Sequence, residues 1–280
     1  TLMSAAGEGA ATLARDTVFA AVMIILNGLV GICLLIGGLR HREQSFQQTG
    51  VSASLATLSA LTVFSLVLPN YTVSEAGPVY STSQLAFVAI ISVILYGTFV
   101  AVQTVRHRDY FLPPKEKAAN VDEHAERPSA GTAALSFMLL IACLVAVVLL
   151  AKQLADPVEQ WVNDWGAPRA LVGVIIAALV LLPESVAAVR ATLANRLQTS
   201  LNLALGSALA TIGLTIPAVA ALSIAMAMPI ALGLDSKSMV LLMLTLLVSA
   251  QALATGKTTI LQGVVHLVIF GVYLFTTIIP

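Results

Sequence analysis

One acidic side chain in the sequence has the setting of a cation site inside a membrane. Glu184 lies deep in the apolar segment VGVIIAALVLLPESVAA, residues 172–188, whereas the other thirteen of the fourteen acidic residues lie in loops or near the ends of apolar segments. A charge at the centre of a bilayer costs at least about 2.5 kcal/mol on insertion scales. Such a carboxylate persists only where it meets water, a partner or an ion, so Glu184 is the first candidate for chemistry.

Pro183, directly before Glu184, supports this interpretation. Proline has no main-chain N–H, so a carbonyl one turn upstream loses its helical partner and becomes available as an oxygen ligand. A carboxylate beside an opened helix suits a hard cation, and the same carboxylate can bind a proton. Competition between a cation and a proton for one oxygen pair would give exchange. The alternative is a protonated carboxyl group that is hydrogen-bonded between helices.

The next apolar segment supplies more oxygen atoms, from Asn202, Ser207, Thr211 and Thr215. Asn202 and Ser207 are five residues apart, about 500° around a helix, so they share a face only loosely. Small residues around Ser207 permit close contact with another helix. Each hydroxyl has the alternative of bonding to its own helix rather than to an ion.

Two more polar side chains stand inside apolar segments, Asn27 and His266. His266 could relay protons, because the ordinary pKa of histidine is about 6.5, or it could be a neutral hydrogen-bonding group between helices. Asn27 could line the same site or bridge helices. Ser207 and His266 could also form the dyad of an intramembrane serine protease. Residues 206–208 (GSA) lack the GxSG pattern of rhomboids, however, and this hypothesis leaves Glu184 without a role. A passive cation channel is a third alternative.

The composition shows what must position these side chains. Of the 280 residues, 58% are hydrophobic and only 10% are charged, against roughly 25% charged residues in a soluble domain. Such a chain cannot cover a water-facing surface, which excludes a soluble enzyme and a disordered tail. Lys+Arg and Asp+Glu number 14 each, so there is no basic field to hold nucleic acid. The sequence therefore predicts an all-α polytopic membrane protein.

Eight apolar segments are long enough to cross a bilayer, which takes about 20 residues. They are residues 17–38, 51–69, 83–104, 132–151, 168–188, 201–228, 239–255 and 259–280. Pro217 is predicted to kink or break the long sixth segment, because it removes a main-chain donor there.

The basic residues predict an orientation for these spans. The loops on the side opposite the start of the chain carry ten Lys and Arg residues, and the loops on the other side carry four. The positive-inside rule makes the side with ten cytoplasmic. The polar linker, residues 105–131, is then cytoplasmic, and both ends of the chain lie outside. Residues 1–16 do not form a signal peptide, so we expect an odd number of spans before residue 1. The alternative is a protein that begins outside.

Two pairs of segments indicate an internal repeat. LNGLVGICLLI, residues 26–36, aligns without gaps to LGSALATIGLT, residues 205–215. Two further spans follow each copy, and the last of these read alike, VAIISVILYGTF at residues 88–99 and VVHLVIFGVYLF at residues 264–275. The first copy starts outside and the second starts inside. Inverted repeats of this kind are typical of secondary transporters.

The stretch LPESVAAVRATLANRLQTSLNLALGSALATIGLTIPAVA, residues 182–220, resembles the second signature repeat of the cation/calcium exchanger superfamily. Within the superfamily it resembles the bacterial calcium/proton antiporters of the ChaA type, and the likeness extends to residues 15–46, the linker and residues 256–275. It implies an inverted-repeat transporter bundle of eleven helices, of which this chain has the last eight. The chain would then be N-terminally incomplete and lack the glutamate of the first repeat.

By the same resemblance, Glu184 binds the cation and competes for the proton, while Asn202 and Ser207 line its site. Leu181 departs from the family pattern, because many calcium/proton exchangers have an asparagine three residues before the glutamate. One fewer ligand oxygen makes sodium and potassium expected cargoes beside calcium.

We therefore predict exchange of Ca²⁺, or of Na⁺ or K⁺, for H⁺ across a bacterial inner membrane, with no enzyme activity and no cofactor. The expected partners are inorganic cations, protons and the lipid bilayer, and the sequence leaves homo-oligomerisation open. Residues 1–104 would be the remainder of the first repeat and residues 132–280 the second, with a periplasmic or extracellular C-terminus.

Overall fold

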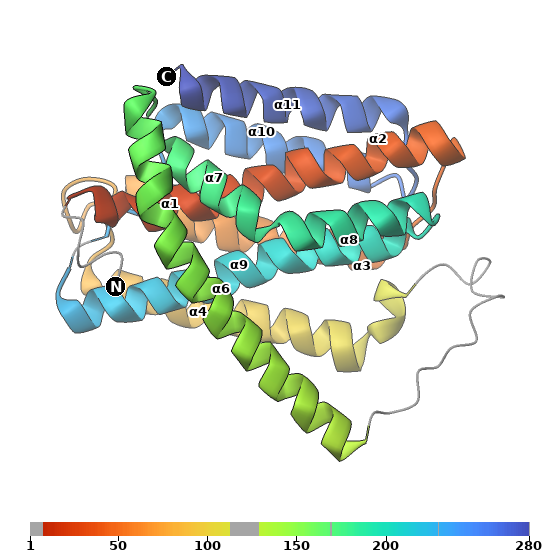
Figure 1. Cartoon of the computed structure of the whole chain (residues 1–280), viewed down its shortest axis with the longest axis horizontal. Coiled ribbons are helices and arrows are strands. Elements are labelled where there is room, and N and C mark those ends of the chain that lie inside the picture. The colour runs from red at the N-terminus through yellow and green to blue at the C-terminus, as the bar shows by residue number, and fades with distance from the viewer. Residues whose placement is uncertain (1–7, 113–128, 169, 229, 280) are drawn as a thin grey trace.

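The computed structural model describes residues 8–112, 129–168, 170–228 and 230–279. Within these ranges the chain forms helices and no strand, with two isolated β-bridges between loops. Long helices lie side by side in a bundle, and α6 crosses it obliquely (Figure 1).

Three spans precede the linker, and each contains a π-helical segment. The first consists of α1 (Glu8–Met23), the π-helix η1 (Ile24–Leu29) and α2 (Val30–His41). The second consists of α3 (Gln48–Thr62), the π-helix η2 (Val63–Val67) and the 3₁₀-helix η3 (Leu68–Tyr71). The third consists of α4 (Thr82–Ala101) and the π-helix η4 (Val102–Arg106), followed by the 3₁₀-helix η5 (Arg108–Phe111).

Six α-helices follow the linker. They are α6 (Ala130–Asp164), α7 (Ala170–Val180), α8 (Leu182–Leu193), α9 (Leu197–Met226), α10 (Ser236–Leu253) and α11 (Ile260–Ile278).

These helices confirm the predicted membrane architecture. Among the described residues, six helices are long and apolar enough to cross a bilayer, and α7 and α8 form a bent pair that makes a seventh span. The remaining predicted span, residues 132–151, lies within α6, whose apolar part is Ala130–Cys143. Helix α6 continues well past the predicted end and includes Pro157.

Of the kink or break predicted at Pro217, the break does not occur. Helix α9 continues through Pro217, and the interrupted helix is instead the preceding span, which bends by 54° between α7 and α8. Helices α3, α4 and α8 pack along α9. Neighbouring helices allow a membrane helix to tolerate the hydrogen bond that proline removes, so α9 stays in one piece.

The packing confirms the inverted repeat. Helix α11, the last of the second set of spans, packs along α2 and η1 of the first span, and α4, the last of the first set, packs along α9. Glycines allow both close approaches: Gly31 lies against His266, Gly263 against the main chain of Leu35, and Gly213 against Tyr96. The first span and α9 run in opposite directions (Figure 1).

The first span is the centre of the bundle. In its apolar window 83% of the residues are buried, compared with 22% to 44% in the other five unbroken spans. Its middle residues, including Met23, Ile25 and Leu26, are fully buried. The first span therefore touches most of the other helices and can transmit contacts between them.

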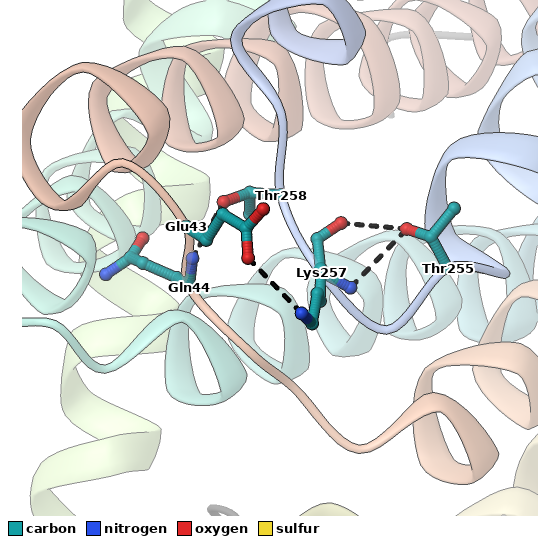
Figure 2. A network of polar contacts seen from close by, with 5 residues as sticks. All are labelled: Glu43, Gln44, Thr255, Lys257 and Thr258. Atoms are coloured by element: carbon teal, nitrogen blue, oxygen red, sulfur yellow. Dashed lines mark hydrogen bonds and ion pairs between the residues drawn. The ribbon is translucent and has the colours of Figure 1, made fainter.

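A hydrogen-bonded junction ties three helix connections together at the linker side of the bundle. The Gln44 main-chain N–H donates to Thr258 Oγ1 at 3.0 Å, and the Thr258 N–H donates to the Gln44 carbonyl at 3.0 Å. Figure 2 shows this contact beside the Glu43–Lys257 ion pair, whose O–N distance is 3.3 Å. The Gln44 side-chain amide donates to the Thr192 carbonyl at 3.1 Å and to Asn195 Oδ1 at 2.9 Å.

We call Gln44, Thr192, Asn195 and Thr258 the Gln44 junction. Gln44 follows α2, Thr192 lies near the end of α8, and Thr258 precedes α11. The junction therefore fixes the linker-side ends of α2 and α8 relative to each other.

Candidate functional site

Glu184 lies in the first turn of α8, directly after the break in the seventh span. Leu181 separates α7 from α8, and Pro183 occupies the start of α8. The Ser185 hydroxyl donates to the Leu181 carbonyl at 2.7 Å. The N-terminal end of a helix carries a partial positive charge that favours a carboxylate. The break thus presents Glu184 at the end of a half-helix, as the sequence predicted.

The carboxylate of Glu184 is not neutralised within the described residues. Its side chain is partly buried, and Oε2 is buried without a hydrogen-bond partner. A buried oxygen of an ionised carboxylate needs a donor or a cation. This oxygen is therefore open to an ion or a proton.

Ser207 lies at the depth of Glu184. Helices α8 and α9 form an antiparallel hairpin, in which the Thr192 and Ser200 hydroxyls are 2.8 Å apart and the Ser200 hydroxyl donates to the Ala188 carbonyl at 2.7 Å. Counted from the Thr192–Ser200 pair, Glu184 is level with Ala208, and counted from the Ala188–Ser200 contact it is level with Ala204, so Ser207 lies within the stretch of α9 that faces this part of α8. Beside Ser207, Gly206 has open space where a side chain would stand.

Asn202 lies about 7.5 Å closer to the linker side than Ser207, by the rise of five helical residues. Its Oδ1 accepts from Gln198 Nε2 at 2.9 Å, and its Nδ2 donates to the Phe111 carbonyl in η5 at 2.6 Å. The structure therefore brings Ser207 to the level of Glu184 but ties Asn202 to the end of the third span.

Asn27 and His266 meet inside the helix bundle, together with Thr245. Asn27 Nδ2 donates to Thr245 Oγ1 at 2.8 Å, and Asn27 Oδ1 lies 3.2 Å from His266 Nδ1. All three side chains are fully buried. Of the two alternatives for Asn27, the structure shows the bridge between helices, from η1 to α10 and α11.

Sequence reasoning missed Thr245. It stands in an apolar run with Ser249 one turn away, and these two hydroxyls in the apolar middle of α10 were the available signal.

The protease hypothesis lacks its dyad. Nδ1 of His266 contacts Asn27, and Nε2 has no hydrogen-bond partner. Ser207 and His266 are therefore not hydrogen-bonded to each other, as a serine nucleophile and its base must be.

Clustered metal ligands are absent from the described ranges, where no group of three or more His, Cys, Asp and Glu side chains could hold a metal ion. A cation at Glu184 would take its other ligands from hydroxyls, opened carbonyls and water, which are oxygen ligands suited to hard cations.

An inverted-repeat helical bundle with an open carboxylate beside a broken helix has the features of an ion-transporting membrane protein. Residues 1–105 and 135–279 match the sodium/calcium exchanger protein family, and the chain belongs to it. It is a multi-pass protein of the inner membrane.

Two relatives and one solved structure show the extent of the likeness. The chain is 51% identical over 279 residues to the ionic transporter y4hA of Sinorhizobium fredii. The alignment covers 100% of this chain and 75% of that protein. It is 34% identical over 275 residues to the sodium-potassium/proton antiporter ChaA of Escherichia coli, covering 98% of the chain and 74% of the relative. The structure of native YfkE has the same fold, with a TM-score of 0.74, 17% identity, and coverage of 98% of this chain and 77% of that one.

Proposed function

We propose that this protein exchanges inorganic cations for protons and that Glu184 is the group both ions share. The observation that carries the proposal is the buried, unpartnered Oε2 of Glu184 at the break between α7 and α8. The deprotonated carboxylate binds the cation, and protonation of the same oxygen releases it. Movement of the surrounding helices then exposes the site to one side of the membrane at a time.

The cargo proposed includes sodium and potassium as well as calcium. The E. coli relative bears the name of a sodium-potassium/proton antiporter, and the family name includes calcium. Leu181, at the helix break, supplies no side-chain oxygen. A site with few fixed oxygen ligands discriminates less strictly between hard cations.

We also propose that the side of the Gln44 junction is cytoplasmic. The ends of α2 and α8 and the start of α11 meet at this side, and its loops carry ten of the fourteen Lys and Arg residues. The positive-inside rule supports this orientation, which places the linker in the cytoplasm and the C-terminus in the periplasm.

The decisive experiment measures proton movement in proteoliposomes that contain the protein expressed from its complete gene. Calcium, sodium and potassium are added in turn, and the Glu184→Gln variant is compared with Glu43→Gln, whose carboxylate is exposed and lies in a loop. We expect cation-driven proton movement in the native protein and in Glu43→Gln, and the level of protein-free liposomes in Glu184→Gln. Unchanged flux in Glu184→Gln would refute the shared site, and current without proton movement would indicate a channel.

A further inference from the structure

Asn27, Thr245 and His266 form a polar triad that the exchange mechanism at Glu184 does not use. The triad lies where η1, α10 and α11 meet, and each of its side chains is fully buried. Helices α2, α10 and α11 lie side by side in Figure 1. Buried polar groups in a membrane mark functional sites when their hydrogen bonds are incomplete.

The hydrogen bonds of the triad have a fixed direction. The Thr245 hydroxyl donates to the Leu241 carbonyl at 2.7 Å, so its oxygen accepts the Asn27 amide N–H. The amide oxygen of Asn27 then faces His266 Nδ1 and accepts from it. In a neutral imidazole only one nitrogen carries hydrogen. With the proton on Nδ1, Nε2 of His266 is a bare, basic lone pair.

No hydrogen-bond donor in the described part of the chain meets this lone pair, and the one other polar group at the ring is an acceptor, the Leu26 main-chain carbonyl. Nε2 is buried and has no hydrogen-bond partner. The elements packed against α11 are α2, η1, α10 and α7, with α1 near its outer end. None of their described charged or titratable side chains is hydrogen-bonded or ion-paired to the ring; these are Cys33, Arg40 and His41 on α2, Lys237 on α10, Arg15 and Asp16 on α1, and Tyr273 on α11 itself.

The triad and Glu184 share the π-helix η1. Helix α8 packs against α2 and η1, while α10 and α11 also pack against η1. Thr192 of α8 touches Gly37 of α2, and the two helices run in the same direction. Counted back from this contact, Glu184 is eight residues from Thr192 and Asn27 is ten residues from Gly37. The two polar side chains therefore lie on neighbouring helices on the same side of this contact. Single π-helical turns are frequent at functional sites.

We propose that Nε2 of His266 is a second proton-binding site of this exchanger, with its tautomer set by Asn27 and Thr245. The proposal rests on the function proposed above and adds a proton acceptor to it. An imidazolium without an acceptor for Nε2–H is unfavourable in a dry interior, so the conformation described here keeps the ring neutral. A conformation that brings water or an acceptor to Nε2 takes up the proton, which couples protonation to the movement of η1.

A second proton-binding site makes the cation KM depend more steeply on pH. If cation binding displaces a proton from His266 as well as from Glu184, each displaced proton steepens the pH dependence of the cation KM by up to about tenfold per pH unit. In the His266→Gln variant, the change of the cation KM per pH unit should be smaller by up to about tenfold, while exchange itself is retained. If the side chain only packs the helices, the substitution lowers the rate equally at every pH.

The first test observes the ring directly and needs no transport. Histidine-selective ¹⁵N NMR of the protein in nanodiscs, with His266→Gln to assign the signal, should show hydrogen on Nδ1 and a bare Nε2 at about pH 8, and growth of a doubly protonated ring towards about pH 5. Hydrogen on Nε2 at the higher pH, or no protonated ring at the lower pH, would overturn the proposal. Thr245→Val should mix the tautomers while leaving the ring in place, which separates a set tautomer from a coincidental one.

The second test compares cation KM across pH for the native protein, His266→Gln and the control His107→Gln, whose ring is exposed on the linker side. A smaller slope in His266→Gln alone supports the site, and equal slopes in all three contradict it. If the native protein shows no exchange, the proposed function fails, whereas the NMR result still decides the proton site.

Discussion

Two neighbouring spans of this protein have irregular segments, but of different kinds. The α7–α8 span bends by 54° beside Pro183 and leaves Glu184 partly exposed with an open oxygen. The first span passes through the π-helix η1 without a break and keeps Asn27 fully buried and hydrogen-bonded to two other helices. A proline break opens a helix to ions, whereas a π-turn rearranges side chains inside a continuous helix. The first interruption suits exchange with water, and the second suits contact between helices.

The largest effect on this comparison should come from the Gln44 junction, because it holds the linker-side ends of both spans. Replacing Gln44 by Met keeps the volume but removes the amide N–H groups that serve the Thr192 carbonyl and Asn195 Oδ1. The Thr192 carbonyl then loses its buried hydrogen-bond donor, which should lower the free energy of unfolding by about 2 kcal/mol. Thermal unfolding in detergent measures this loss, with Gln48→Met, an exposed position at the start of α3, as the control. Equal melting temperatures for the two variants would show that the junction does not hold the spans.

Ser207→Ala should have a smaller effect, which is limited to cation affinity at the α7–α8 span. Ser207 lies in the stretch of α9 that faces the start of α8, next to Gly206 with its open space, and we expect its hydroxyl to contribute one oxygen to a cation. Removing one such contact, worth about 1 kcal/mol, should weaken cation affinity about fivefold. Transport assays at varied cation concentration measure the change.

Ser52→Ala, an exposed serine of α3, is the matched control for Ser207→Ala. Complete loss of transport in Ser207→Ala would contradict a contribution of one oxygen among several, and an unchanged KM would remove Ser207 from the site.

The smallest effect should come from the Glu43–Lys257 ion pair, which touches neither interrupted span. Both side chains are 64% exposed, at an O–N distance of 3.3 Å. Exposed ion pairs contribute about 0.5 kcal/mol or less in double-mutant cycles. A cycle built from Glu43→Gln and Lys257→Met should therefore give a coupling energy near zero, and less still at high salt. A coupling above about 1 kcal/mol would mean that this pair acts as part of the junction.

The spans could be predicted from the sequence because crossing a bilayer imposes a length and an apolar composition that few other structures need. The break at Pro183 followed from the same local chemistry, and it marks Glu184 as a candidate site. The predicted break at Pro217 does not occur because packing of α3, α4 and α8 against α9, not the local sequence, decides whether a helix with proline breaks.

The contacts of the polar groups could not be predicted in this way. Asn27 meets Thr245 and His266 across 218 and 239 residues of chain, and a pattern within one segment does not reveal such partners. Asn202 had the residue type and the spacing of a site residue, but Gln198 and the Phe111 carbonyl occupy its amide. The Gln44 junction went unnoticed because its members are ordinary polar loop residues whose burial only the assembled bundle creates.

The reciprocal packing of the repeats also sets an order of synthesis. Asn27 leaves the ribosome 239 residues before His266, the partner on α11 that completes its contacts. At roughly 5–20 residues per second, the first span waits about 10–50 s in the membrane with a polar amide uncovered. During that time lipid, the insertion machinery or transient neighbouring helices must cover the Asn27 side chain. The native contacts of Asn27 are complete only when α11 has inserted.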